Sequence, residues 1–178
     1  ALASGDFNGD GFDDLAIGIR YEDATIGPGT YTDCGAVLIL YGSSLGLVED
    51  NADKLFPGAP GDRFSAFFGS ALAAGDFDGD GRDDLAVAAP GADVSSQESA
   101  GLVSVYRGSV SGLIDSALNY TQDSSDVNGT MLDASEAFDR FGDALAAGDF
   151  DANGADDLAI GVPRESQNSE SAAGVVQI

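Results

Sequence analysis

Histidine and tryptophan are absent from this chain of 178 residues, and lysine and cysteine occur once each, as Lys54 and Cys34. Without histidine, most zinc sites and every catalytic pair of the Ser–His or Cys–His kind are excluded. A single cysteine forms no disulfide within the chain, so it does not identify the compartment. We expect Cys34 to be a small, partly buried apolar residue, because Asp33 and Gly35 offer no base or cation to activate a thiol.

Positive charge is scarce as well. Seven lysine and arginine residues stand against 31 acidic residues, giving a net charge of -24 at pH 7. No basic patch is available for phosphates, so nucleic acid and anionic membrane surfaces are excluded as partners. No apolar run approaches the length of a membrane-spanning helix, so we expect no membrane insertion. The first residue is not methionine and no signal peptide follows, so we expect a mature or trimmed piece of a longer product.

What the chain does contain is a repeat. An apolar segment, an aspartate loop and a second apolar segment occur in this order at 1–18, 71–88 and 144–161. A glycine-bounded run rich in β-branched residues follows in each unit, at 35–42, 101–108 and 174–178, and we interpret it as a strand. Weaker strand candidates lie at 52–56 and 117–122. Repeats of this kind indicate a modular architecture.

Four short antiparallel strands in each unit are the pattern of a β-propeller blade, so the predicted fold class is all-β. We divide the chain into a partial blade at 1–60, a complete blade at 61–136 and a partial blade at 137–178. The polar segments 21–33, 91–100 and 123–136 are interpreted as surface loops. A closed propeller needs at least about four blades. The predicted propeller is therefore incomplete, and either a longer polypeptide or copies joined through exposed edge strands would complete it.

The three aspartate loops, at 6–14, 76–84 and 149–157, place an oxygen-bearing side chain at positions 1, 3, 5 and 9 of nine. Calcium takes 6–8 oxygen ligands, and alternate positions in a tight loop converge on one point. Glycine at position 6 permits the sharp turn. The predicted metal ligands are the side chains of Asp6, Asn8, Asp10, Asp14, Asp76, Asp78, Asp80, Asp84, Asp149, Asp151, Asn153 and Asp157, with backbone carbonyls at position 7 from Phe12, Arg82 and Ala155.

Two other kinds of aspartate-rich loop, an EF-hand and a simple Asp-Gly turn, differ from these loops. An EF-hand would carry a glutamate at position 12 and continue into a helix, whereas Ile17, Val87 and Ile160 stand there. A simple Asp-Gly turn does not require oxygen-bearing side chains at four fixed positions. Without a cation, the carboxylates of such a loop would repel one another. The aspartates at position 8 are expected to point outward or to support the ligands indirectly. At positions 1, 3, 5 and 9 the second loop carries four carboxylates and each of the other loops carries three. We therefore predict that the second loop binds calcium most tightly.

These motifs resemble the FG-GAP repeats of the integrin α-subunit β-propeller and of similar bacterial repeat proteins. Phe68-Gly69 and Phe141-Gly142 match the FG element, and Ala88-Ala89-Pro90 and Gly161-Val162-Pro163 match the GAP element loosely. At the corresponding place the first unit has Gly18-Ile19-Arg20, which departs from it. The first two loops fit the family's calcium-loop pattern, and the third departs at Asn153. The resemblance implies calcium ions that brace the blade hairpins.

We therefore expect an extracellular or cell-surface module in which calcium is a structural brace and whose role is adhesion, protein interaction or assembly. No catalytic constellation is present in the sequence, so the chain is not expected to be an enzyme. One alternative is the non-catalytic propeller portion of a secreted, phospholipase-like hydrolase. Another is a carbohydrate-binding module, for which Tyr21, Tyr31 and Tyr120 are the candidate platforms. The partner, a protein or a glycan, is not named by the sequence.

Overall fold

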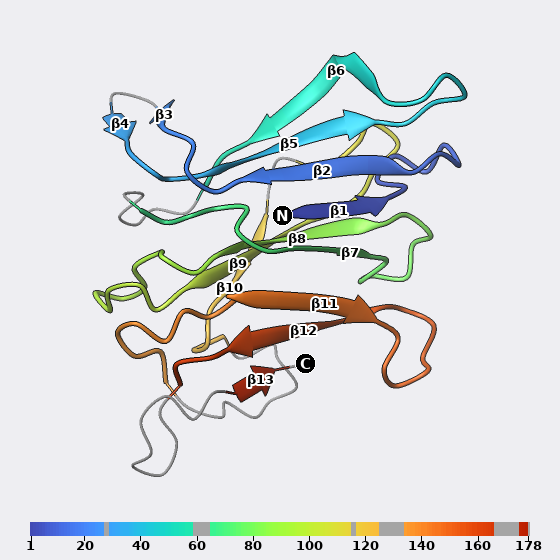
Figure 1. Ribbon diagram of the computed structural model, residues 1–178. Helices are drawn as coiled ribbons and strands as arrows, with labels where there is room; N and C mark the ends of the chain where they lie inside the picture. Colours follow the sequence, from blue (N-terminus) through green and yellow to red (C-terminus); the bar gives the residue numbers. More distant parts are fainter. Residues whose placement is uncertain (27–28, 59–64, 115–116, 125–133, 166–174, 178) are drawn as a thin grey trace.

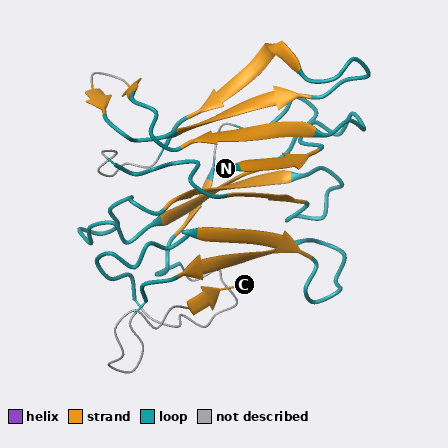
Figure 2. Ribbon diagram, viewed as in Figure 1, coloured by secondary structure: helices purple, strands orange, loops and turns teal. Residues whose placement is uncertain are grey.

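The computed structural model describes residues 1–26, 29–58, 65–114, 117–124, 134–165 and 175–177. In this part of the chain every regular element is a β-strand, and three larger antiparallel sheets lie one above another (Figures 1 and 2). No helix that is long and apolar enough to cross a membrane occurs among these residues. The prediction of an all-β fold built from antiparallel blades is confirmed.

Each blade is a meander, because every strand pairs antiparallel with the next main strand along the chain. The first sheet has the order β1 (Leu2–Gly5), β2 (Asp14–Ile19), β5 (Ala36–Tyr41) and β6 (Val48–Leu55). The second contains β7 (Leu72–Gly75), β8 (Asp84–Ala89), β9 (Leu102–Tyr106) and β10 (Leu118–Tyr120). The third contains β11 (Ala144–Gly148), β12 (Asp157–Val162) and β13 (Val175–Gln177). The first two sheets therefore have four strands each, although the sequence analysis assigned only a partial blade to 1–60.

Two details of the first blade differ from the sequence prediction. The outer strand β6 begins at Val48, earlier than the predicted 52–56, and its pairing with β5 shifts register between Ile39 and Tyr41. The segment 21–33 is not a plain loop, because β3 (Ala24–Ile26) and β4 (Gly29–Tyr31) form a short hairpin within it. Its threonine and isoleucine residues favour strands despite the polar surroundings. The predicted loop at 123–136 and the unit boundary at 60–61 fall largely or wholly outside the described residues.

The middle blade is covered on both faces. All residues of β8 and β9 are buried, whereas β1 and β11 alternate with exposed positions. Successive side chains of a strand point to opposite faces. Accordingly Leu85 and Val87 belong to the core shared with the first blade, and Ala86 and Ala88 to the core shared with the third. A strand buried on both faces has a continuous apolar sequence, which explains the run Leu85–Ala89.

A Phe–Gly pair closes each interface at one end of the strands. The amide of Phe68 donates to the carbonyl of Cys34 at 2.9 Å, and that of Phe141 donates to the carbonyl of Ala100 at 2.8 Å. Both phenylalanine side chains are fully buried. The FG elements of the second and third units are thus the points where each blade is joined to the blade before it.

Cys34 lies at one of these junctions and is fully buried. Its thiol donates to the carbonyl of Glu22 at 3.4 Å, and burial raises the pKa of that thiol. A raised thiol pKa disfavours the reactive thiolate. The expectation that Cys34 is a packing residue is therefore confirmed, with deeper burial than the sequence suggested.

Candidate metal centres

The three aspartate loops lie at the same end of the stacked blades, at the right of Figure 1. Each connects the first two strands of a blade, which pair antiparallel, so that Gly5 lies opposite Asp14, Gly75 opposite Asp84 and Gly148 opposite Asp157. This hairpin register brings position 9 beside the residue that precedes position 1. The prediction that these loops join strands and not helices is confirmed.

The aspartate at position 1 organises each loop through backbone amides. In the first loop the carboxylate of Asp6 accepts hydrogen bonds from the amides of Asp10 and Gly11 at 3.0 and 2.8 Å. Asp76 and Asp149 accept the equivalent pairs at 2.9 to 3.1 Å. Position 5 continues the turn, since Asp10 Oδ1 accepts the Phe12 amide at 2.9 Å. Three loops of different sequence thus share one hydrogen-bond pattern.

Positive backbone angles accompany this pattern. The glycine at position 6 has φ of 89° in Gly11, 88° in Gly81 and 95° in Gly154, as the sequence predicted. Position 4 also has positive φ, 72° in both Gly9 and Gly79. In the third loop that position is Ala152, with φ of 61°, a conformation that non-glycine residues adopt at some cost.

In the first two blades, the aspartate at position 9 ties its loop to the end of the blade's third strand. Asp14 is 1 % exposed, and its two oxygens accept the amides of Phe7 at 2.9 Å and Gly42 at 2.8 Å. Asp84 is similarly buried and accepts the amide of Gly108 at 2.8 Å. Burial raises the pKa of Asp14, and it raises the pKa of Asp84 to about 6. These buried carboxylates are poorly solvated, and a nearby cation would favour their ionised form.

Oxygen atoms from several positions converge as a cation requires. Carboxylate oxygens of Asp76, Asp78 and Asp80 all lie within 4.8 Å of one another, and so do those of Asp149, Asp151 and Asp157. A carboxylate oxygen that accepts one amide keeps a second lone pair for a metal. Hard oxygen donors in a flexible loop suit calcium. In the first loop position 3 is Asn8, and no third carboxylate completes such a group among the described residues.

Other parts of the predicted ligand set stay predictions. The amides of Phe12, Arg82 and Ala155 donate to the side chain at position 5 of their own loops at 2.8 to 3.0 Å. That places position 7 within the turn, and its carbonyl as a ligand is an expectation. Ligation by the side chain at position 9 is likewise an expectation in the first two loops, where Asp14 and Asp84 accept backbone amides.

Two arginines form ion pairs with carboxylates of the second loop. Arg82 Nη2 lies 2.6 Å from Asp80 Oδ2, and Arg107 Nη1 lies 3.3 Å from Asp78 Oδ2. These guanidinium groups offset part of the charge of Asp76, Asp78, Asp80 and Asp84. The prediction that the second loop binds most tightly rests on formal charge, and the arginines oppose it.

Replacing Arg107 with glutamine is expected to strengthen calcium binding at the second loop about two- to fivefold. The Arg107 side chain is half exposed, so its repulsion of a cation is screened and the effect is modest. Calorimetric titration with calcium at low ionic strength measures it. Arg20→Gln is the matched control, since Arg20 lies over the ring of Tyr21 and pairs with none of the loop carboxylates. Equal affinity in the Arg107 variant and the unsubstituted chain would contradict the expectation.

Position 8 does not behave uniformly. Asp13 is exposed, as predicted for a side chain pointing outward. Asp83 and Asp156 are only partly exposed, and each accepts a backbone amide from the loop of the preceding blade. The sequence-based expectation allowed an indirect supporting role, but it gave no reason to assign that role to a neighbouring loop.

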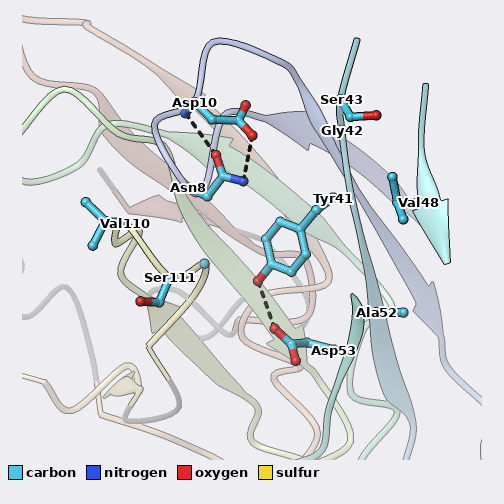
Figure 3. Close-up of a pocket in the computed structure, with 11 residues that line it drawn as sticks. Asn8, Asp10, Tyr41, Gly42, Ser43, Val48, Ala52, Asp53, Val110 and Ser111 are labelled. Atoms are coloured by element: carbon cyan, nitrogen blue, oxygen red, sulfur yellow. Dashed lines mark hydrogen bonds between the residues drawn. The ribbon is translucent and has the colours of Figure 1, made fainter. Parts of the chain in front are cut away.

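A pocket of about 580 Å³ opens beside the first loop, between β5, β6 and the turn 109–113 of the second blade (Figure 3). Asn8 and Asp10 line it on one side and Val110 and Ser111 on another. The Tyr41 hydroxyl donates to Asp53 at 2.9 Å and accepts the amide of Leu113 at 3.2 Å. Tyr41 therefore links the first two blades.

The predicted aromatic platforms contribute to packing. Tyr21 lies edge-on to Phe67 with ring centroids 5.7 Å apart, and the Arg20 guanidinium lies over its ring. Tyr120 packs against the core between the second and third blades. Tyr31 is in the β3–β4 hairpin. Tyr21 is 61 % exposed, and Tyr31 and Tyr120 are partly exposed, so the carbohydrate-binding alternative stays a prediction.

Comparison with known proteins gives the same repeat. The family model described as FG-GAP repeat matches residues 1–40, 68–106 and 141–178, one segment in each blade. The chain is 37 % identical over 165 residues to phosphatidylinositol-glycan-specific phospholipase D of Rattus norvegicus, covering 91 % of this chain. It is 35 % identical over 163 residues to integrin alpha-4 of Xenopus laevis, and 30 % identical over 169 residues to integrin alpha-V of Gallus gallus, covering 90 and 92 % of this chain.

The chain spans only 18 % of the length of the phospholipase and 14 and 13 % of the two integrins. Nearly all of this chain is therefore similar to a small portion of each relative. The segments matched by the family model include all three loops and both FG elements. The resemblance inferred from the sequence is confirmed, and the chain belongs to the FG-GAP repeat family, as part of an integrin-like β-propeller.

Proposed function

We propose that this chain is a calcium-braced portion of an extracellular or cell-surface β-propeller that serves adhesion, protein interaction or assembly. One observation carries the proposal: three loops of different sequence share one hydrogen-bond pattern. In the second and third loops, three carboxylates also direct oxygens to a common region. In each loop calcium would be held by the side chains at positions 1, 3, 5 and 9 and by the position-7 carbonyl. When bound, it supplies charge neutralisation and cross-linking within the hairpin.

The experiment is a direct titration of the chain with calcium and, separately, with magnesium. We expect three calcium sites with dissociation constants of about 10⁻⁴–10⁻³ M, the range of extracellular calcium modules. Magnesium should bind more weakly, because it demands near-ideal octahedral geometry and gives up its waters reluctantly.

Variants then assign the sites. Asp10→Ala and Asp80→Ala should each remove one site and leave the others. Glu49→Gln in β6 is the control, because it removes an exposed acidic charge outside the loops and should leave all three sites. A chain that takes up no calcium at millimolar concentration would overturn the proposal.

A second candidate function has one supporting observation, the 37 % identity to a phospholipase D. On this view the chain is the propeller portion of a secreted hydrolase, and its own role is again non-catalytic. The two candidate functions differ in the domains that would be joined to the propeller in the longer protein. Both give the aspartate loops the same role as calcium sites. Partners remain a protein or a glycan, and edge-strand association of copies is a third possibility that sedimentation of the native material would test.

A further inference from the structure

The aspartate at position 8 contacts the loop of the preceding blade. Asp83, in the second loop, accepts the amide of Asp6 at 2.8 Å through its Oδ2 atom. In return the amide of Asp83 donates to the carbonyl of Asp6 at 3.2 Å. Asp6 is position 1 of the first loop. One residue of the second loop thus holds both backbone polar groups of the residue that organises the first.

The same arrangement recurs at the next interface. Asp156 accepts the amide of Asp76 at 3.1 Å, and its own amide donates to the carbonyl of Asp76 at 2.8 Å. The partners are 77 residues apart at the first interface and 80 at the second. Because the same donors and acceptors occur at both interfaces, this contact is a regular feature of how neighbouring blades pack.

A glycine before position 1 makes room for this contact. A Cβ atom on Gly5 would lie 2.6 Å from Asp83 Oδ2, and one on Gly75 would lie 2.6 Å from Asp156 Oδ2. No real Cβ atom tolerates that distance without a shift of its neighbour. The residue beside Asp83 also packs on the first loop, since a Cβ on Gly9 would lie 2.9 Å from Arg82 Cγ. The second loop therefore rests directly on the first.

We propose that Asp83 and Asp156 are positioning residues that set the calcium affinity of the preceding blade's loop. This inference rests on the calcium function proposed above. Asp83 fixes the peptide of Asp6, whose carboxylate receives the amides of Asp10 and Gly11. Loss of Asp83 would therefore loosen the residue that organises the first loop, while the second loop keeps its own position-1 residue, Asp76.

The test uses Asp83→Ala with Asp13→Ala as its matched control. Asp13 has the same position and charge in the first loop, but it is exposed. Calcium titration is followed by the amide NMR signals of Gly11 and Gly81, each of which donates to position 1 of its own loop. In the Asp83 variant we expect about fivefold weaker binding reported by Gly11 and a change of less than twofold reported by Gly81. Asp13→Ala should change neither.

Asp83→Asn keeps one oxygen acceptor and should weaken the Gly11 response only about twofold, which distinguishes positioning from general damage to the fold. It also serves if the alanine variant does not fold. An unchanged Gly11 response in both variants, or a loss confined to Gly81, would overturn the inference. The unsubstituted chain is titrated first. If neither glycine signal responds to calcium there, the proposed calcium function is wrong, which is a different result from a failure of the positioning role.

Discussion

Chelation of calcium is expected to lower the unfolding temperature of this chain by about 10 °C relative to the chain in 10 mM calcium. A ligand that binds only the folded state stabilises it by RT ln(1 + [L]/Kd). With a dissociation constant of about 1 mM, each site contributes about 1.4 kcal/mol at this concentration, and three independent sites contribute about 4 kcal/mol. For a domain of this size, 1 kcal/mol corresponds to about 2–4 °C.

The physical reason lies in the loops. In the second loop three carboxylates have oxygens within 4.8 Å of one another, and Asp84 is buried beside them with a raised pKa. Without a cation these groups repel, and only amide hydrogen bonds and two arginines oppose the repulsion. Calcium removes that repulsion in the folded state. In the unfolded chain the carboxylates are far apart and bind it weakly.

Circular dichroism in the far ultraviolet, at constant ionic strength, measures the effect. Magnesium at the same concentration is the control for non-specific screening of the charge of -24, and it should give less than half the shift. Replacing Asp6, Asp76 and Asp149 together with asparagine should abolish the difference between calcium and chelator. If the unsubstituted chain melts at the same temperature in calcium and in chelator, calcium is not a brace of this fold.

The sequence predicted the loops better than it predicted their surroundings. Positions 1, 3, 5 and 6 act within a few residues of one another. Their spacing alone therefore indicated that Asp6, Asn8 and Asp10 converge and that Gly11 permits the sharp turn, although it did not show that Asp6 organises the loop through backbone amides. The signal for the strands beside the loops is equally local, because each strand is an apolar run bounded by glycine. These parts of the fold depend on short-range geometry, which a repeated pattern displays directly.

Contacts between distant segments were not visible in that pattern. Asp14 reaches Gly42, 28 residues away, and Asp83 reaches Asp6 in another blade. The Asp14 contact depends on the pairing of β2 with β5 within one sheet, and the Asp83 contact depends on how two sheets stack. In an isolated hairpin a position-8 aspartate would simply face solvent, as Asp13 does. The Arg107 contact was missed for a related reason: Arg107 follows β9 and meets Asp78 only once the blade is formed.

The junctions at the other end of the blades give the second large prediction: Gly101→Ala should destabilise the chain by about 3 kcal/mol or more. Gly101 has φ of 97°, and a Cβ there would lie 2.4 Å from both the nitrogen and the oxygen of Phe141. Those are backbone atoms, and the Phe141 amide is already held by Ala100 at 2.8 Å. Relief would require the FG segment to move and its fully buried ring to leave the core.

Gly46→Ala is the matched control, because Gly46 has φ of 100° and nothing within 4 Å of its added Cβ. It should lose only about 1 kcal/mol from backbone strain. Urea unfolding of both variants, in calcium and in chelator, therefore separates strain from collision with the next blade. The destabilisation by Gly101→Ala should be equal in the two conditions, since the junction lies at the opposite end of the strands from the loops. Equal losses in the two glycine variants would mean that the FG contact does not hold the second and third blades together.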